Sequence, residues 1–163
     1  MTMADQIGSY IMAQLALIRL GQTITLFNGS TFAFRTDAGS LVQKQMEYTE
    51  NPDAFPSLVF YTGKNTVQLS GSPDPELGME NRLQEFSIEG FIECAKDGGA
   101  GDWLKSDITV ALRADPWWGG LIIDLQNIET ESAIQVGDKV FAVVKFSAQA
   151  LYTVPLCSPH ARG

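Results

Sequence analysis

The sequence predicts a single α+β domain in which a mostly antiparallel sheet is covered by two helices. Near the N-terminus and again after residue 101, apolar residues recur with the period of an α-helix. Most other segments alternate between apolar and polar residues, as half-buried strands do. The chain has 163 residues, the usual size of one domain, and shows no internal repeat or linker.

The first helix is predicted from Asp5 to Leu20. Asp5 can cap its start, and Gly21 can end it. Apolar residues at steps of four, four and three form one face, namely Ile7, Ile11, Leu15 and Ile18. We therefore expect this face to pack on the sheet.

Short strands joined by turns are predicted next. Two strands flank a tight turn at Asn28–Gly29. The segment 39–53 is compatible with either a strand or a loop. Leu58–Thr62 is a strand, "GKN" at 63–65 a turn, and Thr66–Leu69 the returning strand.

The segment Gly71–Arg82, "GSPDPELGMENR", is predicted to be a flexible insert. It contains two prolines and two glycines and offers little apolar surface to bury. Its acids, Asp74, Glu76 and Glu80, are candidate contacts for another protein. The C-terminal residues 156–163 have no pattern and are expected to be loose.

A half-buried strand follows in "LQEFSIEGFIECAK". One face carries apolar side chains, namely Phe86, Ile88, Ile92 and Cys94. The other face carries Glu85, Glu89 and Glu93 with Phe91 among them. This alternation predicts an acidic outer face, which a solvated surface explains better than a catalytic carboxylate pair does.

The second helix is predicted to begin at Asp102 and to stop before Pro116. Its apolar stripe comprises Leu104, Ile108, Ala111 and Leu112. Two further strands, "GLIIDLQNIETE" and "KVFAVVKFSAQALYTVP", are joined by a turn in "QVGDK". The last of these alternates clearly between apolar and polar residues.

Trp117 and Trp118 lie side by side between Pro116 and two glycines. In a strand these rings would point to opposite faces. In a short connection, one ring can fix the helix end onto the sheet while the other stays exposed. An exposed tryptophan is a favoured anchor of a protein interface.

Charge and cysteine content exclude several classes of protein. Nineteen acids against eleven bases give a net charge of −8, with no basic cluster to grip nucleic acid or an anionic membrane. No apolar run is long enough for a membrane span, and the N-terminus does not resemble a secretory signal. Cys94 and Cys157 form neither a disulfide framework nor a zinc motif. A reducing compartment is therefore expected.

The sequence lacks a recognisable set of catalytic groups. His160 is its only histidine and falls in the C-terminal segment expected to be loose, where it is poorly placed to act as an oriented general base. "TGKN" and "GGAGDW" are incomplete as phosphate-binding and dinucleotide-binding motifs. We therefore expect no enzyme, no cofactor and no metal, but a structural or binding role.

Several phrases resemble the tail-terminator family of long-tailed bacteriophages, of the minor tail protein U type. They are "FPSLVFYTG", "FSIEGFIE", "ALRADPWWGGL" and "VFAVVKFSAQALYTVP", and the resemblance covers roughly residues 4–155. The family's order of elements, a short helix before the sheet, a second helix ending in a glycine turn and a closing hairpin, is similar too. The insert and the doubled tryptophan have no counterpart in this comparison.

The resemblance implies a virion protein made in the host bacterial cytoplasm. Members form a hexameric ring on the head-proximal end of the tail tube, stop its polymerisation and present a surface to the head's neck proteins. The implied partners are other copies of the chain, the major tail tube protein and a head-completion protein. DNA would pass through the ring without specific binding, and Glu85, Glu89 and Glu93 are candidate lumen acids.

Two other interpretations remain open at the level of sequence. The chain can be another neck or head-completion protein, or a terminator from a contractile tail. It can also be a small enzyme or ligand-binding domain with an unrecognised site. Converging acids in a deep pocket would favour the latter.

Overall fold

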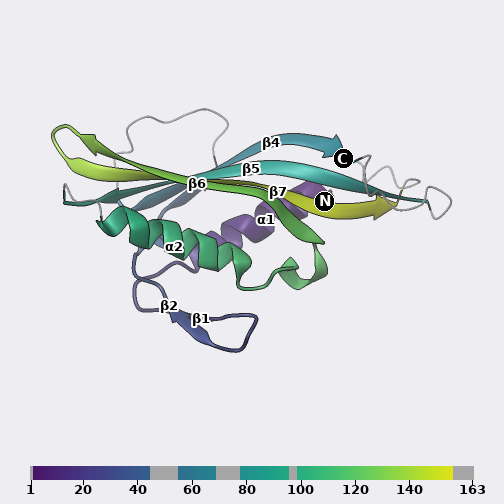
Figure 1. Ribbon diagram of the computed structural model, residues 1–163, viewed down its shortest axis with the longest axis horizontal. Coiled ribbons are helices and arrows are strands. Elements are labelled where there is room, and N and C mark those ends of the chain that lie inside the picture. The colour runs from purple at the N-terminus through teal and green to yellow at the C-terminus, as the bar shows by residue number, and fades with distance from the viewer. Residues whose placement is uncertain (1, 45–54, 69–77, 96–98, 156–163) are drawn as a thin grey trace.

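The computed structural model describes residues 2–44, 55–68, 78–95 and 99–155. It confirms the predicted α+β class: helices α1 (Met3–Ala16) and α2 (Gly99–Arg113) pack on one face of a five-stranded sheet. A separate two-stranded hairpin, β1 (Thr23–Thr25) and β2 (Thr31–Ala33), lies beyond the helices (Figure 1). The predicted turn at Asn28 and Gly29 joins its strands.

The main sheet is mostly antiparallel, with the strand order β3-β4-β5-β7-β6. The pairs β4–β5, β5–β7 and β7–β6 are antiparallel, whereas β3 runs parallel to β4. The strands are β3 (Val42–Lys44), β4 (Ser57–Val67), β5 (Met79–Glu93), β6 (Asp124–Val136) and β7 (Val140–Pro155). The long pairing of β5 with β7 forms the centre of the sheet and leaves β6 at an edge.

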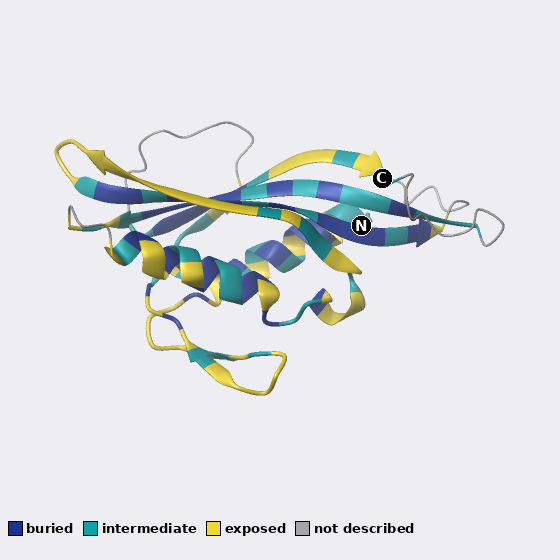
Figure 2. Ribbon diagram, in the orientation of Figure 1, coloured by how far each residue is buried: buried dark blue, intermediate teal, exposed yellow. Residues whose placement is uncertain are grey.

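The main core lies between the helices and this sheet (Figure 2). All eight residues predicted as the apolar faces of the two helices are at most 1% exposed. The sheet contributes alternating residues of its inner face, including Phe86, Ile88, Val144 and Phe146. Burial of these side chains from water is the main force that holds the layers together.

Helix α1 differs from its prediction at both ends. Thr2 is the N-cap: its hydroxyl accepts from the Asp5 backbone N–H at 3.1 Å, and the Asp5 carboxylate accepts from the Thr2 N–H. The helix stops at Ala16, where Leu17 and Ile18 donate to carbonyls only three residues back. Ile18 stays buried although it lies past the helix.

The predicted turn at 63–65 is wrong. Strand β4 runs through it, with a register shift between Thr62 and Asn65, because β5 is long enough to pair with both halves. The predicted insert is also shorter than expected, since Met79 to Arg82 pair with β7. Residues 71–77 of that insert and the C-terminal segment 156–163 lie outside the described residues.

Candidate functional site

Trp118 is the buried member of the tryptophan pair. It is 2% exposed and stacks on Tyr10 of α1, with ring centroids 4.9 Å apart. Its indole N–H donates to the Leu112 carbonyl at the end of α2, at 2.8 Å. Its ring also lies 6.1 Å from that of Phe86 on β5. The prediction that one ring fixes the helix end onto the sheet is thus confirmed.

In the loop after α2, Trp117 points away from the core, and this residue is 48% exposed. Asp115 shapes this loop by accepting from the backbone N–H groups of Trp117, at 3.0 Å, and Gly119, at 2.7 Å. Gly119 and Gly120 have φ values of 67° and 92°, which glycine adopts without strain. Trp118 itself has a φ of 50°, so the left-handed turn begins at the second tryptophan and the two glycines continue it.

The exposed Trp117 meets the turn of the β1–β2 hairpin. Trp117 and Phe27 contact each other edge to face, with ring centroids 5.0 Å apart and ring planes at 88°. Phe27 is itself 66% exposed. We call these two residues the aromatic ridge. Contiguous apolar exposure of this kind is typical of interaction sites. The sequence gives no local signal for Phe27, because only the fold brings it to Trp117.

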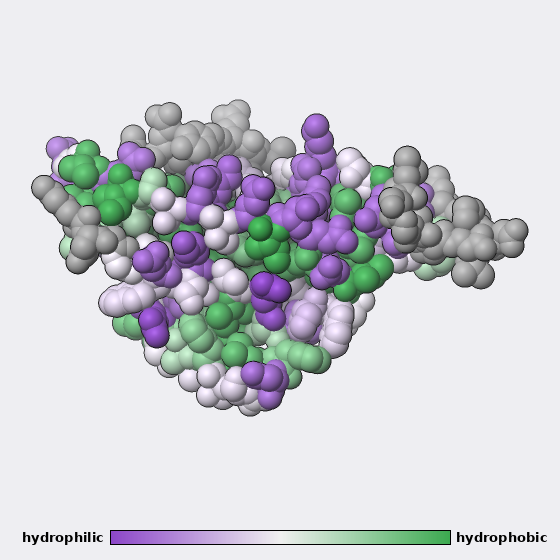
Figure 3. Space-filling model, viewed as in Figure 1, coloured by the Kyte–Doolittle hydropathy of each residue, from purple (hydrophilic) through white to green (hydrophobic). Residues whose placement is uncertain are grey.

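A second apolar surface lies where the hairpin meets the first turns of α2. This hairpin hollow has a volume of about 600 Å³. It is lined by Leu20, Gly21, Thr31, Phe32, Ala33, Phe34, Arg35 and Trp103. Leu20 is 66% and Trp103 47% exposed. In Figure 3, apolar atoms gather in the lower part of the molecule, where the hairpin lies.

Asp107 of α2 holds the hairpin's return segment in place. Its fully buried carboxylate accepts from the backbone N–H groups of Arg35 and Thr36 and, at 2.7 Å, from the Thr36 hydroxyl. Burial raises the pKa of Asp107, and these hydrogen bonds oppose the rise. The sequence held a signal for this role, because Asp107 falls within the apolar stripe between Leu104 and Ala111.

The three predicted lumen acids share the sheet face that points away from the helices, but their environments differ. Glu93 is exposed and pairs with Lys139 at 3.2 Å. Glu85 is half-buried and accepts from the Gln149 amide at 3.2 Å. Glu89 is buried, which corrects the expectation of a uniformly solvated acidic face. Its neighbours belong to a second apolar cluster built on Val59, Phe91 and Phe141.

The buried position of Glu89 changes its chemistry. Burial raises the pKa of Glu89, while the positive charge of Lys145, its partner across β7, lowers it by less. Among the described residues, none forms a hydrogen bond with Glu89 Oε2. Glu89 is therefore a poorly compensated carboxylate within the sheet's outer face.

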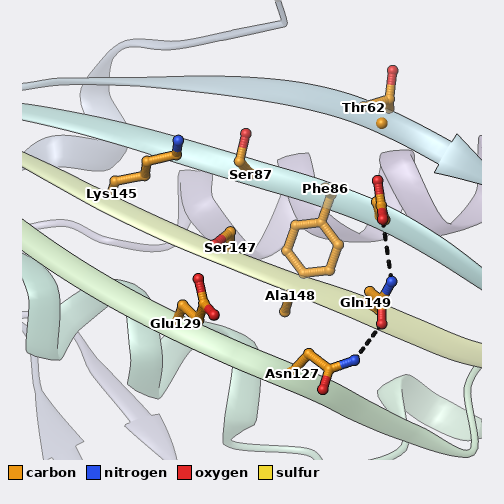
Figure 4. A pocket seen from close by; sticks show the side chains of 11 residues that line it. Thr62, Phe86, Ser87, Asn127, Glu129, Lys145, Ser147, Ala148 and Gln149 are labelled. Carbon is orange, nitrogen blue, oxygen red and sulfur yellow. Dashed lines mark hydrogen bonds between the residues drawn. The ribbon is translucent and has the colours of Figure 1, made fainter.

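A shallow depression of about 350 Å³ crosses β5, β7 and β6 on this outer face (Figure 4). Within it, Asn127 donates to Gln149, which donates to Glu85. Lys145 and Glu129 lie farther along the same surface. The lining is polar, and part of it is held by these internal hydrogen bonds. Within the described parts of the chain, no group of three or more His, Cys, Asp or Glu residues is placed to hold a metal.

The candidate acids of the insert divide into two groups. Asp74 and Glu76 lie outside the described residues. Glu80 belongs to β5, its side chain is 14% exposed, and its carboxylate pairs with Arg82 at 2.9 Å. Arg82 also donates to Asn65 of β4 at 2.8 Å. The Glu80 carboxylate is thus engaged in an ion pair within the sheet.

No protein family and no curated protein matches this chain in sequence comparisons. In the described ranges, no helix is long and apolar enough to span a membrane. Two exposed apolar surfaces of the described structure, the aromatic ridge and the hairpin hollow, are suited to contact another protein.

Proposed function

We propose that this chain is a structural bacteriophage protein, a tail terminator that forms a hexameric ring on the head-proximal end of the tail tube. The ring stops tube polymerisation and joins the tail to the neck of the head. The observation that carries the proposal is the aromatic ridge, because its two touching aromatic residues remain 48% and 66% exposed. In a ring, contact with a neighbouring subunit would cover them.

The positions of the resembling phrases support this proposal. "FPSLVFYTG", "FSIEGFIE" and "VFAVVKFSAQALYTVP" contribute to the three adjacent strands β4, β5 and β7. "ALRADPWWGGL" covers the end of α2 and the turn that displays Trp117. The similarity thus falls on the centre of the sheet and on the end of α2, whereas the doubled tryptophan, which supplies Trp117 to the ridge, has no counterpart in the family.

The proposed role requires no catalytic group and no cofactor. Its partners are further copies of the chain, the tail tube protein and a neck protein. DNA passes through the ring without sequence-specific contacts, which agrees with the net charge of −8. The working location is the virion, after synthesis in the bacterial cytoplasm.

Two measurements test this function together. Light scattering over a concentration series gives the mass of the free protein, and electron microscopy shows whether it adds to the ends of purified tail tubes. We expect a sixfold ring at one end of each tube and an arrest of tube elongation. A stable dimer in both settings, or tubes that keep growing with the protein present, contradicts the proposal.

A further inference from the structure

The aromatic ridge and the hairpin hollow are both apolar and lie at different ends of α2. We propose that the hairpin hollow of one copy receives the aromatic ridge of a second copy, so that neighbouring subunits contact head to tail. This inference rests on the proposed function, because it names the subunit interface of the ring. It commits to a second copy of this chain as the occupant of the hollow.

The positions of the two surfaces allow a head-to-tail contact between copies. Trp103 lies in the first turns of α2, and Trp117 follows its last turn. A helix of 15 residues is roughly 20 Å long. One copy can therefore use its ridge on one neighbour and its hollow on another. Such a head-to-tail contact forms a closed ring when the rotation between copies closes.

The chemistry of the two surfaces matches as well. The ridge is convex, since Phe27 stands at the hairpin turn and is 66% exposed. The hollow is concave, and Leu20 and Trp103 leave much of their apolar surface in water. Docking would remove aromatic surface from water on both sides, which is the usual origin of strong anchors in interfaces.

Charge favours contact between ridge and hollow over contact between two like surfaces. Asp115 lies beside the ridge, where it accepts from the Trp117 N–H, and the exposed Arg35 lines the hollow. Ridge against hollow brings these opposite charges together. Ridge against ridge would instead bring two Asp115 carboxylates together, and hollow against hollow two Arg35 side chains, both of which are unfavourable.

Mixing two variants of the full chain tests the proposal. The ridge variant carries Phe27→Ser and Trp117→Ser, and the hollow variant carries Ala33→Arg, which fills the hollow from an exposed position. Each should weaken self-association at least about 30-fold. The matched control is Val136→Ser, because Val136 is 68% exposed beside the β6–β7 turn and belongs to neither surface. The control should assemble like the wild type.

The mixture supplies the decisive result. A ridge variant keeps its hollow, and a hollow variant keeps its ridge, so that together they have one intact interface. We expect each variant to be monomeric alone and their equimolar mixture to stop at a dimer in light scattering. Because the dimer forms only from folded partners, this result also shows that both variants fold.

Three results would overturn the inference: a wild type that stays monomeric at its highest soluble concentration, variants that assemble like the wild type, or a mixture that gains no dimer. Electron microscopy of tail tubes separates this failure from that of the proposed function. If the wild type and both variants cap the tubes as sixfold rings, the ridge–hollow contact is wrong while the terminator function stands. If the wild type neither self-associates nor caps tubes, both are wrong.

Discussion

At the scale of single residues, the tryptophan pair separates stability from assembly. Trp118→Ala should lower the free energy of unfolding by about 3–5 kcal/mol, because it empties a packed aromatic site and removes the bond to the Leu112 carbonyl. Trp117→Ala removes only a half-exposed ring and should cost no more than about 1 kcal/mol. Urea denaturation measures both values. Equal losses would show that both rings belong to the core.

Asp107 provides a second test at this scale. Asp107→Ala leaves two backbone N–H groups and the Thr36 hydroxyl without their acceptor. Each buried group left unsatisfied costs about 1–3 kcal/mol, so that we expect a total loss of about 3 kcal/mol or more. The control is Asp102→Ala in the same helix, whose side chain is 75% exposed and should cost about 0.5 kcal/mol. Similar losses in both variants would contradict the anchoring role of Asp107.

Glu89 predicts a pH dependence of stability. Its folded-state pKa is raised above the ordinary value of 4.5 because it is buried. The folded state therefore binds the proton more tightly than the unfolded state. The contribution of Glu89 to the stability of the folded state is most favourable at and below pH 4.5, and it declines as the pH rises through the folded-state pKa.

The variant Glu89→Gln removes this titration. The unfolding free energy of the wild type minus that of the variant should fall as the pH rises from 4 to 8. Chemical denaturation at a series of pH values gives this difference. A difference that is constant, or that rises with pH, would show that burial does not disfavour the ionised form of Glu89.

At the scale of elements, the packing of α1 depends on one close approach. Gly39, in the short 3-10 helix Ala38–Ser40, lies against the end of α1 and donates to the Ile18 carbonyl at 2.7 Å. A Cβ at this position would lie 2.5 Å from the Leu15 carbonyl oxygen, which is backbone and cannot rotate away. Gly39→Ala should therefore displace the end of α1 and lower the melting temperature.

The control for this change is Gly99→Ala. A Cβ on Gly99, the first residue of α2, meets no atom within 4 Å in the described structure. Alanine also favours the helix by up to about 1 kcal/mol, so that this variant should melt at the same temperature as the wild type or higher. If both variants melt alike, the contact between Gly39 and α1 is not tight.

Periodicity predicted the elements better than it predicted their limits. The apolar faces of both helices and the alternation of β5 and β7 were confirmed, because each reflects burial against one neighbouring layer. The turn expected at 63–65 was wrong, because pairing with β5 outweighs the local preference of "GKN" for a turn. Neither the burial of Glu89 nor the meeting of Phe27 with Trp117 could be predicted locally, since both depend on segments distant in sequence.

At the scale of the whole molecule, net charge connects the proposed ring with the passage of DNA. Basic side chains in the lumen would bind phosphates and slow this passage, whereas acids repel them within roughly 8 Å at physiological salt. Glu85 and Glu93 on the outer sheet face are the candidates that the structure leaves accessible, since Glu89 is buried. We therefore expect that this face lines the lumen.

Glu85→Lys, alone and combined with Glu93→Lys, tests this expectation in assembled phage. Rings should still form, but DNA ejection should slow, and it should slow more at low salt because screening is then weaker. Asp102→Lys, on the helix layer, makes the same change in net charge as Glu85→Lys and should leave the rate unchanged. Ejection rates that respond equally to Glu85→Lys and Asp102→Lys would mean that only the total charge matters. Rates that respond to neither would mean that these acids serve solubility, because a net charge far from zero keeps a protein soluble.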